Sequence, residues 1–422
     1  MKKFLCAILA VTVVAVCALS GCGLFSSAKD GRDGQDLNIY EIYEAANAAR
    51  EEEGKEQLTF LEFLREYLNY NFEYSEDDLK EQINRSLLSS VIIFPGFKYN
   101  GQRELLYGGG SGVIVDLDKT AGNAYILTNA HVVLDFEANP NTPLEYLIYL
   151  YGSENYSYNY LENVELVTCS VSYDLALLKV TNSTILKNSD ARAAAFAESD
   201  DVYVGEKVYT IGNPGGTGMS VSSGIISKES EFIAVDFADG TGAENSYRVI
   251  RTDTATNSGN SGGALYDGSG RVVGIVNAKD GDANNENLGY ALCGSYVKRI
   301  WKLMRDGYLS TIGSYGIRCA VFPSTYTYSS QTYYNNYTNL TEIRDVVRVL
   351  HSGGELRMGD IIKHIKIVDG TGATVEDKEV TRFYNVDDVL ISARSGYKII
   401  YTVERSGELQ EISTTPNFKN FI

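Results

Sequence analysis

One short segment, Gly259-Asn260-Ser261-Gly262-Gly263, constrains the fold of this chain more than any other. Glycine on both sides of a serine lets the backbone turn tightly, so that amide N–H groups converge on one point. Converging amides are what a developing oxyanion requires during acyl transfer. The segment therefore predicts a serine hydroxyl that is presented at a tight turn and followed by a short strand.

A serine hydroxyl is a weak nucleophile and needs a base. The chain has 3 histidines, and only His131 precedes the serine. The other two, His351 and His364, lie far downstream, where we expect surface or packing roles. Asp174 lies between His131 and the serine, directly before an apolar run. In this arrangement Ser261 attacks a carbonyl, His131 carries the proton, and Asp174 fixes the tautomer of the imidazole.

The order His131, Asp174, Ser261 is the order of the chymotrypsin fold, and it differs from those of subtilisin and the α/β-hydrolases. It predicts that the histidine and the aspartate belong to one half of a two-barrel domain and the serine to the other. Each residue alone has an ordinary explanation, because glycine-flanked serines are usually turns and an aspartate can simply open a buried strand. The three together, in this order, favour a catalytic site.

Six segments extend this pattern along the chain. They are GSGVIV (110–115), YILTNAHVV (125–133), DLALLKV (174–180), IGNPGG (211–216), SVSSGIIS (220–227) and TDTATNSGNSGG (252–263). In this order they resemble the HtrA/DegP-type serine proteases. The resemblance implies a mainly β fold of two six-stranded antiparallel barrels with the cleft between them, in which Gly259 and Ser261 supply the oxyanion-hole amides. It also implies ATP-independent cleavage of unfolded or misfolded envelope proteins through an acyl-enzyme, and a homo-oligomer that is a trimer in this family.

Two residues shortly before Ser261 bear on the cleavage preference. In chymotrypsin-fold enzymes the residue six before the nucleophile lies at the base of the S1 pocket, and here it is Ala255. We expect no preference for Arg or Lys, because a buried cation needs a charged partner. Small or medium apolar P1 residues fit better, although the hydroxyl of Thr256 makes the pocket less apolar.

Residues 1–21 read as a lipoprotein signal peptide. Two lysines precede an apolar run at 4–19, and the run ends in LSGC at 19–22. The pattern resembles a bacterial lipobox, in which cleavage before Cys22 is followed by diacylation of its thiol, and two acyl chains give stable membrane attachment. We therefore expect a lipid-anchored protein of the bacterial cell envelope, outside the cytoplasm. An ordinary signal peptide and an uncleaved anchor remain as alternatives.

Residues 22–85 read as a polar tether followed by amphipathic helices, with apolar residues at helical spacing in 39–46, 59–68 and from Ser75 onwards. These helices could cover the protease domain, mediate oligomers or act as a spacer. The protease domain is expected at 86–306. It should begin with a strand at 87–94 and end with an amphipathic helix that Gly307 terminates.

Residues 308–415 resemble a PDZ domain. The match consists of LRMGDII at 356–362, a helix at 386–394 and a closing strand at 397–405. Tyr315, Gly316 and Ile317 stand where the carboxylate-binding loop is expected, since PDZ domains capture an extended C-terminus as an added strand. Tyr315 replaces the usual leucine of that loop, so we expect peptide binding to be weak.

The remaining signals limit partners and cofactors. A net charge of −18 argues against nucleic acid as a partner. No metal or cofactor is expected, because His131 is the only imidazole of the expected protease domain and the chain lacks a phosphate-binding loop. Cys169, Cys293 and Cys319 follow the lipid-bearing Cys22; they are expected to be buried small hydrophobes, with a Cys293–Cys319 disulfide as the alternative.

Two function classes therefore stand. The first is an active serine endopeptidase. The second is a PDZ-bearing chaperone, scaffold or sensor in which proteolysis is secondary or normally off. The complete set of His131, Asp174 and Ser261 favours the first class.

Overall fold

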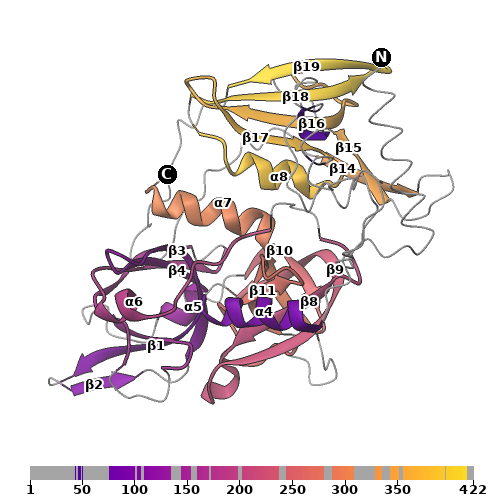
Figure 1. The fold of residues 1–422 in the computed structure, drawn as a ribbon. Coiled ribbons are helices and arrows are strands. Elements are labelled where there is room, and N and C mark those ends of the chain that lie inside the picture. The colour runs from indigo at the N-terminus through magenta and orange to yellow at the C-terminus, as the bar shows by residue number, and fades with distance from the viewer. Residues whose placement is uncertain are drawn as a thin grey trace, which may run out of the picture. The chain divides into compact units, whose positions relative to one another are not determined.

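The computed structural model describes residues 43, 46–48, 50, 76–99, 102–105, 109–134, 144–153, 159–170, 173–197, 202–236, 244–279, 288–307, 328–334, 343–350, 355–394 and 396–415. The chain divides into two compact units, Met1–Ser75 and Glu76–Ile422. In the first unit, the described residues 43, 46–48 and 50 are helical. The signal peptide, the tether and the helix expected at 59–68 lie outside the described residues. All strands of the described residues belong to the second unit (Figure 1).

The first half of the protease region is a seven-stranded antiparallel sheet in the order β2-β1-β3-β4-β7-β6, with β5 paired to the other edge of β1. Its strands are β1 (Ser90–Tyr99), β2 (Gln102–Leu105), β3 (Gly110–Asp118), β4 (Asn123–Thr128), β5 (Leu144–Leu150), β6 (Val164–Ser170) and β7 (Leu175–Val180). The sheet curls so that β5 contacts β6. It thus forms most of the expected barrel without a β5–β6 pairing to close it, and β2 is a seventh strand added by a hairpin at the end of β1.

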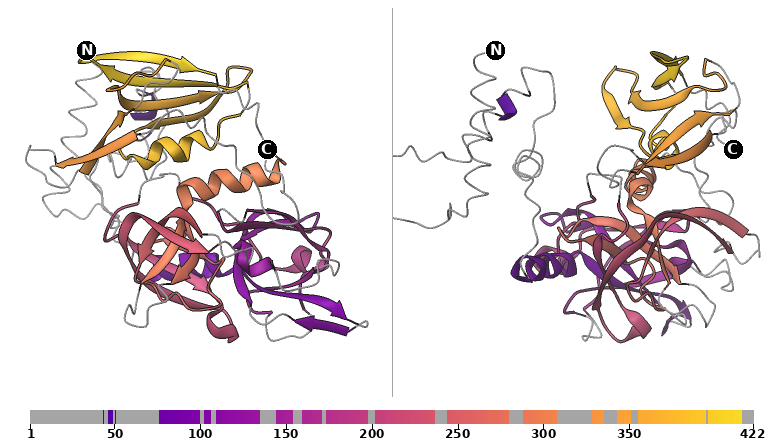
Figure 2. Two further views of the ribbon diagram at one scale, coloured as in Figure 1. Left: turned by 180° about the vertical axis from the view of Figure 1, so that it is seen from behind. Right: turned by 90° about the vertical axis from the view of Figure 1, so that its right-hand side faces the viewer.

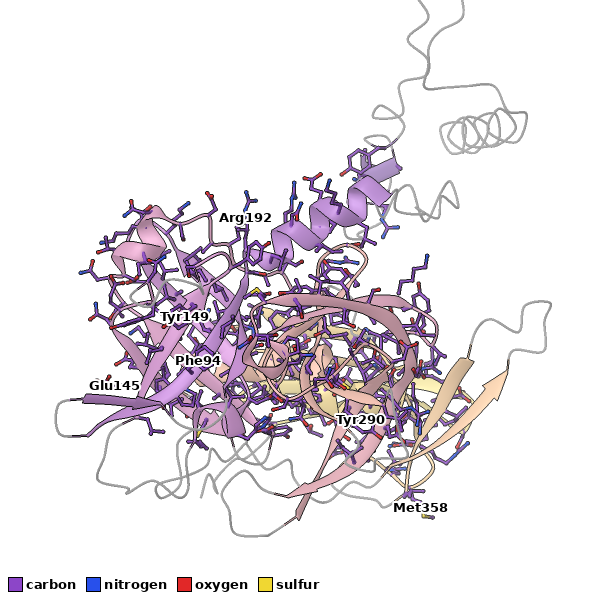
Figure 3. The ribbon with its side chains drawn as sticks, turned by 90° about the horizontal axis from the view of Figure 1, so that it is seen from below. Phe94, Glu145, Tyr149, Arg192, Tyr290 and Met358 are labelled. Carbon is purple, nitrogen blue, oxygen red and sulfur yellow. The ribbon has the colours of Figure 1, made fainter. Side chains whose placement is uncertain are left out.

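Alternation along β1 gives the sheet two apolar faces. Val91 and Ile93 point into the barrel core, and Ile92 packs on the outside against Leu147 and Tyr149. Figure 3 labels Tyr149 and Phe94, whose rings meet edge to face at 6.2 Å between centroids. Tyr149 of β5 therefore has a packing role.

The second half is a closed six-stranded barrel in the order β10-β13-β12-β11-β8-β9. Its strands are β8 (Lys207–Gly212), β9 (Ser220–Asp236), β10 (Glu244–Thr252), β11 (Ala264–Asp267), β12 (Val272–Lys279) and β13 (Gly289–Cys293). The core of this barrel also takes in Val113, Leu127, Leu175 and Leu177 from the first sheet. Because one core spans both halves, it fixes the positions of the strand ends that face it. The mainly β two-barrel fold is confirmed (Figure 2).

The start of the domain differs from the sequence expectation. The strand expected at 87–94 begins only at Ser90, because helix α4 (Glu76–Leu87) continues through Leu87. Leu79, Ile83 and Leu87 lie at four-residue spacing and pack on the closed-barrel core, which extends the helix.

Serine hydroxyls fix the end of α4 to two buried tyrosines of the closed barrel. Ser86 Oγ lies 2.9 Å from Tyr209 Oη. Ser89 Oγ and Ser90 Oγ lie 3.1 and 3.2 Å from Tyr266 Oη. The two phenol rings stack at 5.3 Å. Buried phenols need hydrogen-bond partners, and these three serines supply them.

Three short helices and one longer helix complete the region. The short ones are α5 (Ala130–Val133), α6 (Thr184–Asn188) and the 3-10 turn η1 (Pro214–Gly216). The longer one, α7 (Gly294–Arg305), buries its apolar face and is followed by Gly307 at φ +72°, as expected from the spacing.

The C-terminal part is a six-stranded sheet in the order β14-β15-β16-β18-β19, with β17 paired to β16. Its elements are β14 (Tyr328–Tyr334), β15 (Ile343–Val349), β16 (Ile361–Val368), β17 (Thr374–Glu379), α8 (Tyr384–Leu390), β18 (Lys398–Arg405) and β19 (Glu408–Thr414). The expected helix at 386–394 is α8, which begins two residues earlier and ends at Leu390. The expected closing strand is β18. The assignment of this part as a PDZ domain, and the domain boundaries, remain predictions.

Buried ion pairs attach the C-terminal sheet to the closed barrel and α7. Arg248 of β10 pairs with Asp388 of α8, and their side chains are 8% and 4% exposed. Arg299 of α7 binds Glu376 of β17 through two hydrogen bonds of 2.8 and 2.9 Å. Helices α7 and α8 contact each other at this interface (Figure 1).

Candidate active site

His131 and Asp174 meet because their strands are neighbours in the first sheet. His131 follows β4 in helix α5, and Asp174 directly precedes β7, with Thr128 of β4 opposite Ala176 of β7. His131 Nδ1 lies 2.6 Å from Asp174 Oδ2. The backbone N–H of His131 donates to Asp174 Oδ1 at 2.9 Å. Both carboxylate oxygens therefore face the histidine.

The backbone of Asp174 is held in an unusual conformation. Its φ is +48°, in the left-handed region that aspartate and asparagine tolerate better than most residues. Asn129 Nδ2 donates to the Asp174 carbonyl at 2.8 Å, which helps to hold this turn. Tyr146 Oη donates to the carbonyl of Val133 and supports the end of α5.

Burial and Asp174 act on the pKa of His131 in opposite directions. Burial lowers the pKa of His131, but the negative charge of Asp174 and the hydrogen bond to it raise the pKa by more, so it lies above the ordinary value of 6.5. The imidazole remains 39% exposed, whereas the Asp174 side chain is 9% exposed. A half-exposed imidazole with Nδ1 protonated against a carboxylate presents Nε2 as a base.

The turn that carries Ser261 is clamped by Ser111 of β3. The Ser111 N–H donates to the Ser261 carbonyl at 2.8 Å, and Ser111 Oγ donates to the Gly259 carbonyl at 2.7 Å. Gly259 has φ +99°, and a Cβ there would lie 2.1 Å from the Asn213 carbonyl oxygen. Only glycine fits this position. The clamp therefore joins the serine of the closed barrel to a strand of the first sheet.

Two backbone amides of this turn are available to a ligand. The Gly215 N–H donates to the Ser258 carbonyl at 2.8 Å. Because a trans peptide directs its N–H opposite to its C=O, the Gly259 N–H points away from Gly215. Among the described residues, neither the Gly259 nor the Ser261 N–H donates to another group of the protein. Such a pair of unpaired amides beside a serine can bind an oxyanion.

The Ser261 hydroxyl is directed at a residue that the sequence did not single out. Within the described residues, Ser261 Oγ donates to the carbonyl of Asn277 at 3.3 Å rather than to His131. Asn277 Nδ2 in turn donates to Asp174 Oδ2 at 2.5 Å. The available signal was an asparagine at the end of the apolar run VVGIV in β12, since a buried amide requires a polar partner.

Ala255 and Thr256 precede Ser261 by six and five residues, and contacts to three other segments hold them. The Ala255 N–H donates to Ser222 Oγ, and its carbonyl accepts from Asn260 Nδ2, both at 2.9 Å. Thr256 lies against Gly289, where a Cβ would approach the threonine side chain to 2.6 Å. Ala255 is exposed, and its place in an S1 pocket stays a prediction.

Other residues named from the sequence fall into two groups. Cys22, Tyr315, Gly316, Ile317 and Cys319 lie outside the described residues. Cys169 and Cys293 are buried, and neither forms a disulfide within the described residues.

The described part of the chain holds neither a cluster of metal ligands nor a membrane-spanning helix. No group of three or more His, Cys, Asp or Glu side chains is arranged to hold a metal ion. No helix in the same part of the chain combines the length and the apolar character needed to cross a membrane. The expected absence of a cofactor stays a prediction.

Comparisons with known proteins agree with this geometry. The trypsin-like peptidase domain matches residues 110–275. The serine protease Do-like HtrB of Bacillus subtilis (strain 168) is 37% identical over 221 residues, which are 51% of this chain and 43% of that protein. The periplasmic serine endoprotease DegP of Escherichia coli (strain K12) is 33% identical over 205 residues, which are 48% of this chain and 37% of that protein. The chain thus matches less than half the length of either relative.

A solved serine endoprotease from Yersinia pestis aligns with 82% of this chain and 98% of its own chain, at 21% identity and a TM-score of 0.40. The sequence relatives and the domain match carry the assignment. The chain contains a trypsin-like peptidase domain and is related to the serine proteases named HtrA and DegP.

Proposed function

We propose that the protein is a serine endopeptidase in which Ser261 is the nucleophile, His131 the general base and Asp174 the group that orients the base. The observation that carries this proposal is the contact of 2.6 Å between His131 Nδ1 and Asp174 Oδ2. It keeps the proton on Nδ1 and leaves Nε2 to accept the serine proton. The relatives that match this domain are serine proteases by name, which supports the same chemistry.

The reaction would proceed in two halves. His131 takes the proton of Ser261 as Oγ attacks the scissile carbonyl, and the Gly259 and Ser261 amides receive the oxyanion. Protonation of the leaving amine by His131 gives the acyl-enzyme, and water then enters by the same route in reverse. The charge on Asp174 stabilises the imidazolium formed in each half. No step draws on ATP or on a metal ion.

The resting position of the Ser261 hydroxyl is compatible with this route. Its hydrogen bond to the Asn277 carbonyl is 3.3 Å long, which is longer than the usual range for hydroxyl donors and therefore weak. A neutral hydrogen bond contributes about 1 kcal/mol, so rotation of the hydroxyl towards His131 costs little. Active-site hydrogen bonds often tighten only when substrate is bound.

Substrates and location belong to the proposal as well. The uncharged Ala255 favours small or medium apolar P1 residues over Arg and Lys, although the hydroxyl of Thr256 makes the pocket less apolar. We propose unfolded or misfolded proteins of the cell envelope as substrates, since one relative is named a periplasmic endoprotease. A homo-oligomer, trimeric by family resemblance, and a weak peptide site at Tyr315, Gly316 and Ile317 complete the proposed partners.

Cleavage of an unfolded protein tests the catalytic assignment. Purified wild-type protein is expected to degrade casein, and Ser261→Ala is expected to lose several orders of magnitude in kcat while it folds normally. Ser258→Ala is the matched control, because this exposed serine lies in the same turn. Equal casein cleavage by Ser261→Ala and wild type would refute the assignment. Binding of casein without Ser261-dependent cleavage would support the chaperone or scaffold class instead.

Attachment through Cys22 is a separate proposal, and it rests on LSGC directly after the apolar run. Mass spectrometry of the mature N-terminus is expected to find a diacylated Cys22 as the first residue. Cys22→Ala should block this processing. An unmodified terminus at another position would contradict lipid anchoring but would leave the catalytic assignment untouched.

A further inference from the structure

Asp174 lies in the tight turn of the hairpin that β6 and β7 form. Ser170 of β6 pairs with Leu175 of β7, so only residues 171–174 turn the chain. Asp174 ends this turn with φ +48°, a left-handed conformation that costs free energy in a residue with a Cβ. Such a conformation persists only where the surrounding contacts enforce it. The contacts of the turn therefore decide where the Asp174 carboxylate lies.

Tyr173, the residue before Asp174, attaches this turn to helix α7. The centre of its ring lies 5.8 Å from that of Tyr296 in α7, and the two ring planes are inclined by 47°. Tyr173 is half-buried and packs on the core of the closed barrel. Both strands of the hairpin also contact α7. The ring of Tyr173 thus reaches from the first sheet to the core of the barrel that carries Ser261.

Tyr296 is a well-anchored partner for this ring. It is 3% exposed and lies in the first turn of α7. Its Oη donates to the Arg248 carbonyl at 2.9 Å, and Arg248 Cζ lies 5.7 Å from the centre of its ring. A close-packed interior transmits displacement, so a side chain held in this way fixes whatever packs on it. Tyr296 therefore gives Tyr173 a firm seat.

Two other hydrogen bonds hold the turn at the positions around the Tyr173 ring. The Tyr173 N–H donates to Ser170 Oγ at 3.2 Å. Asn129 Nδ2 donates to the Asp174 carbonyl at 2.8 Å. These bonds fix the backbone before and after the two residues. The contact between the rings is the one that ties the turn to the closed barrel through Tyr173.

We propose that Tyr173 is a positioning residue for catalysis: its ring, seated on Tyr296, holds the turn in which Asp174 faces His131. This inference rests on the proposed peptidase function. It assigns Tyr173 no contact with the substrate. Its effect reaches the reaction through the position of the Asp174 carboxylate.

Two substitutions at Tyr173 test the role of the ring. Tyr173→Ala removes it, and we expect kcat to fall about 10- to 100-fold, because a misplacement of about 1 Å in an active site costs up to about 10²-fold. KM should change by less than about twofold, since the substrate-binding groups are untouched. Tyr173→Phe keeps the ring and should retain most of the wild-type kcat. Loss of activity in Tyr173→Phe equal to that in Tyr173→Ala would overturn the role of the ring.

The pH dependence of kcat/KM separates positioning from a general loss of stability. Asp174 raises the pKa of His131 by its charge and by its hydrogen bond. When Tyr173→Ala lets the carboxylate move away, the pKa of His131 falls, and the acid limb of the profile moves to lower pH. In Tyr173→Phe the limb should keep its wild-type midpoint. A residue that only packs would lower activity without moving the midpoint.

A tyrosine pair elsewhere in the first half of the domain gives the matched control. Tyr160 is also half-buried, and its ring meets that of Tyr149 edge to face at 6.2 Å between centroids. Both belong to the apolar cluster on the outside of the first sheet. Tyr160→Ala is expected to lower the melting temperature and to leave kcat and the pH profile unchanged. The same shift of the acid limb in Tyr160→Ala would overturn the specific role of Tyr173.

NMR of His131 gives a readout that does not depend on catalysis. In the Ser261→Ala background the imidazole pKa of His131 can be followed, with only His351 and His364 as other histidine signals. Adding Tyr173→Ala is expected to lower this pKa, and an unchanged pKa would overturn the proposal. Inactivity of the wild-type protein would instead refute the proposed function, so the two failures remain distinguishable.

A double-mutant cycle tests the contact itself. Tyr296→Leu removes the partner ring, and the double variant with Tyr173→Ala should lower the pKa of His131 no further than the stronger single variant does. Additive shifts would overturn Tyr296 as the seat. If either variant does not fold, Tyr173→Leu keeps an apolar side chain on the barrel core and should lower the pKa of His131. An unchanged pKa in folded Tyr173→Leu would then overturn the proposal.

Discussion

Removal of Asp388 should destabilise the protein strongly, because the buried Arg248 guanidinium would lose the carboxylate to which it is hydrogen-bonded. Arg248 donates to Asp388 and also to Ser295 Oγ at 2.9 Å and Cys293 Sγ at 3.1 Å. Its Cζ lies 4.2 Å from the centre of the Tyr384 ring. In Asp388→Ala the neutral partners remain, but the countercharge is lost.

The size of the effect follows from the burial of both side chains, which are 8% and 4% exposed. Breaking a buried pair by removing one partner costs about 3–5 kcal/mol. For a large domain this corresponds to a drop in melting temperature of roughly 10 °C. The double variant Arg248→Met with Asp388→Leu removes both charges and should recover most of the loss, because an apolar pair of similar volume is often as stable as a buried ion pair.

Thermal and urea unfolding in the Ser261→Ala background would measure this without self-digestion. Glu81→Ala is the control, since the Arg85–Glu81 pair has side chains that are 55% and 59% exposed. Loss of such an exposed pair costs less than about 1 kcal/mol. A loss below about 1 kcal/mol in Asp388→Ala, or separate melting of the C-terminal sheet in the parent protein, would refute a docked arrangement.

Three further outcomes concern catalysis. The kcat/KM of the wild type should fall as the pH drops through the pKa of His131, with a midpoint above 6.5. The stability that protonated His131 contributes has the opposite pH dependence: it is present at acid pH and is lost as the pH rises through that pKa. Urea titrations at several pH values would show this. Asp174→Asn should lower kcat about 10⁴-fold by favouring the wrong tautomer, and move the acid limb to lower pH, in a peptide assay. Gly259→Ala should lower kcat by about 10²–10³-fold, because a Cβ would lie 2.1 Å from the Asn213 carbonyl oxygen and displace an oxyanion-hole amide; wild-type kcat would contradict this.

The contact between His131 and Asp174 could be predicted from the sequence, because the residues around each of them have a recognisable pattern. Each residue adjoins an apolar strand, and neighbouring strands of one sheet bring their ends together. The glycines around Ser261 were equally readable, since the left-handed φ at Gly259 excludes other residues.

The position of Asn277 beside Asp174 could not be predicted from the sequence, because it depends on a shift in strand register. An unbroken ladder would direct position 277 differently, and no local residue marks where β12 slips against β13. The contact of α8 with the closed barrel could not be predicted either, for a related reason. Arg248 and Asp388 are 140 positions apart in the sequence, and no residue near either of them indicates that they pair.

The hydrogen bonds that join Ser86, Ser89 and Ser90 at the end of α4 to buried tyrosines of the closed barrel affect how the domain would bear mechanical load. If the chain is tethered at Cys22, as proposed, tension enters the described part of the second unit at Glu76. Ser86, with its partner Tyr209, passes that load to β8 of the closed barrel before it reaches β1. A closed barrel has no free edge from which strands can be peeled one by one. A pull from the membrane would thus be carried by the barrel of the serine, and the sheet that holds His131 and Asp174 would be shielded from it.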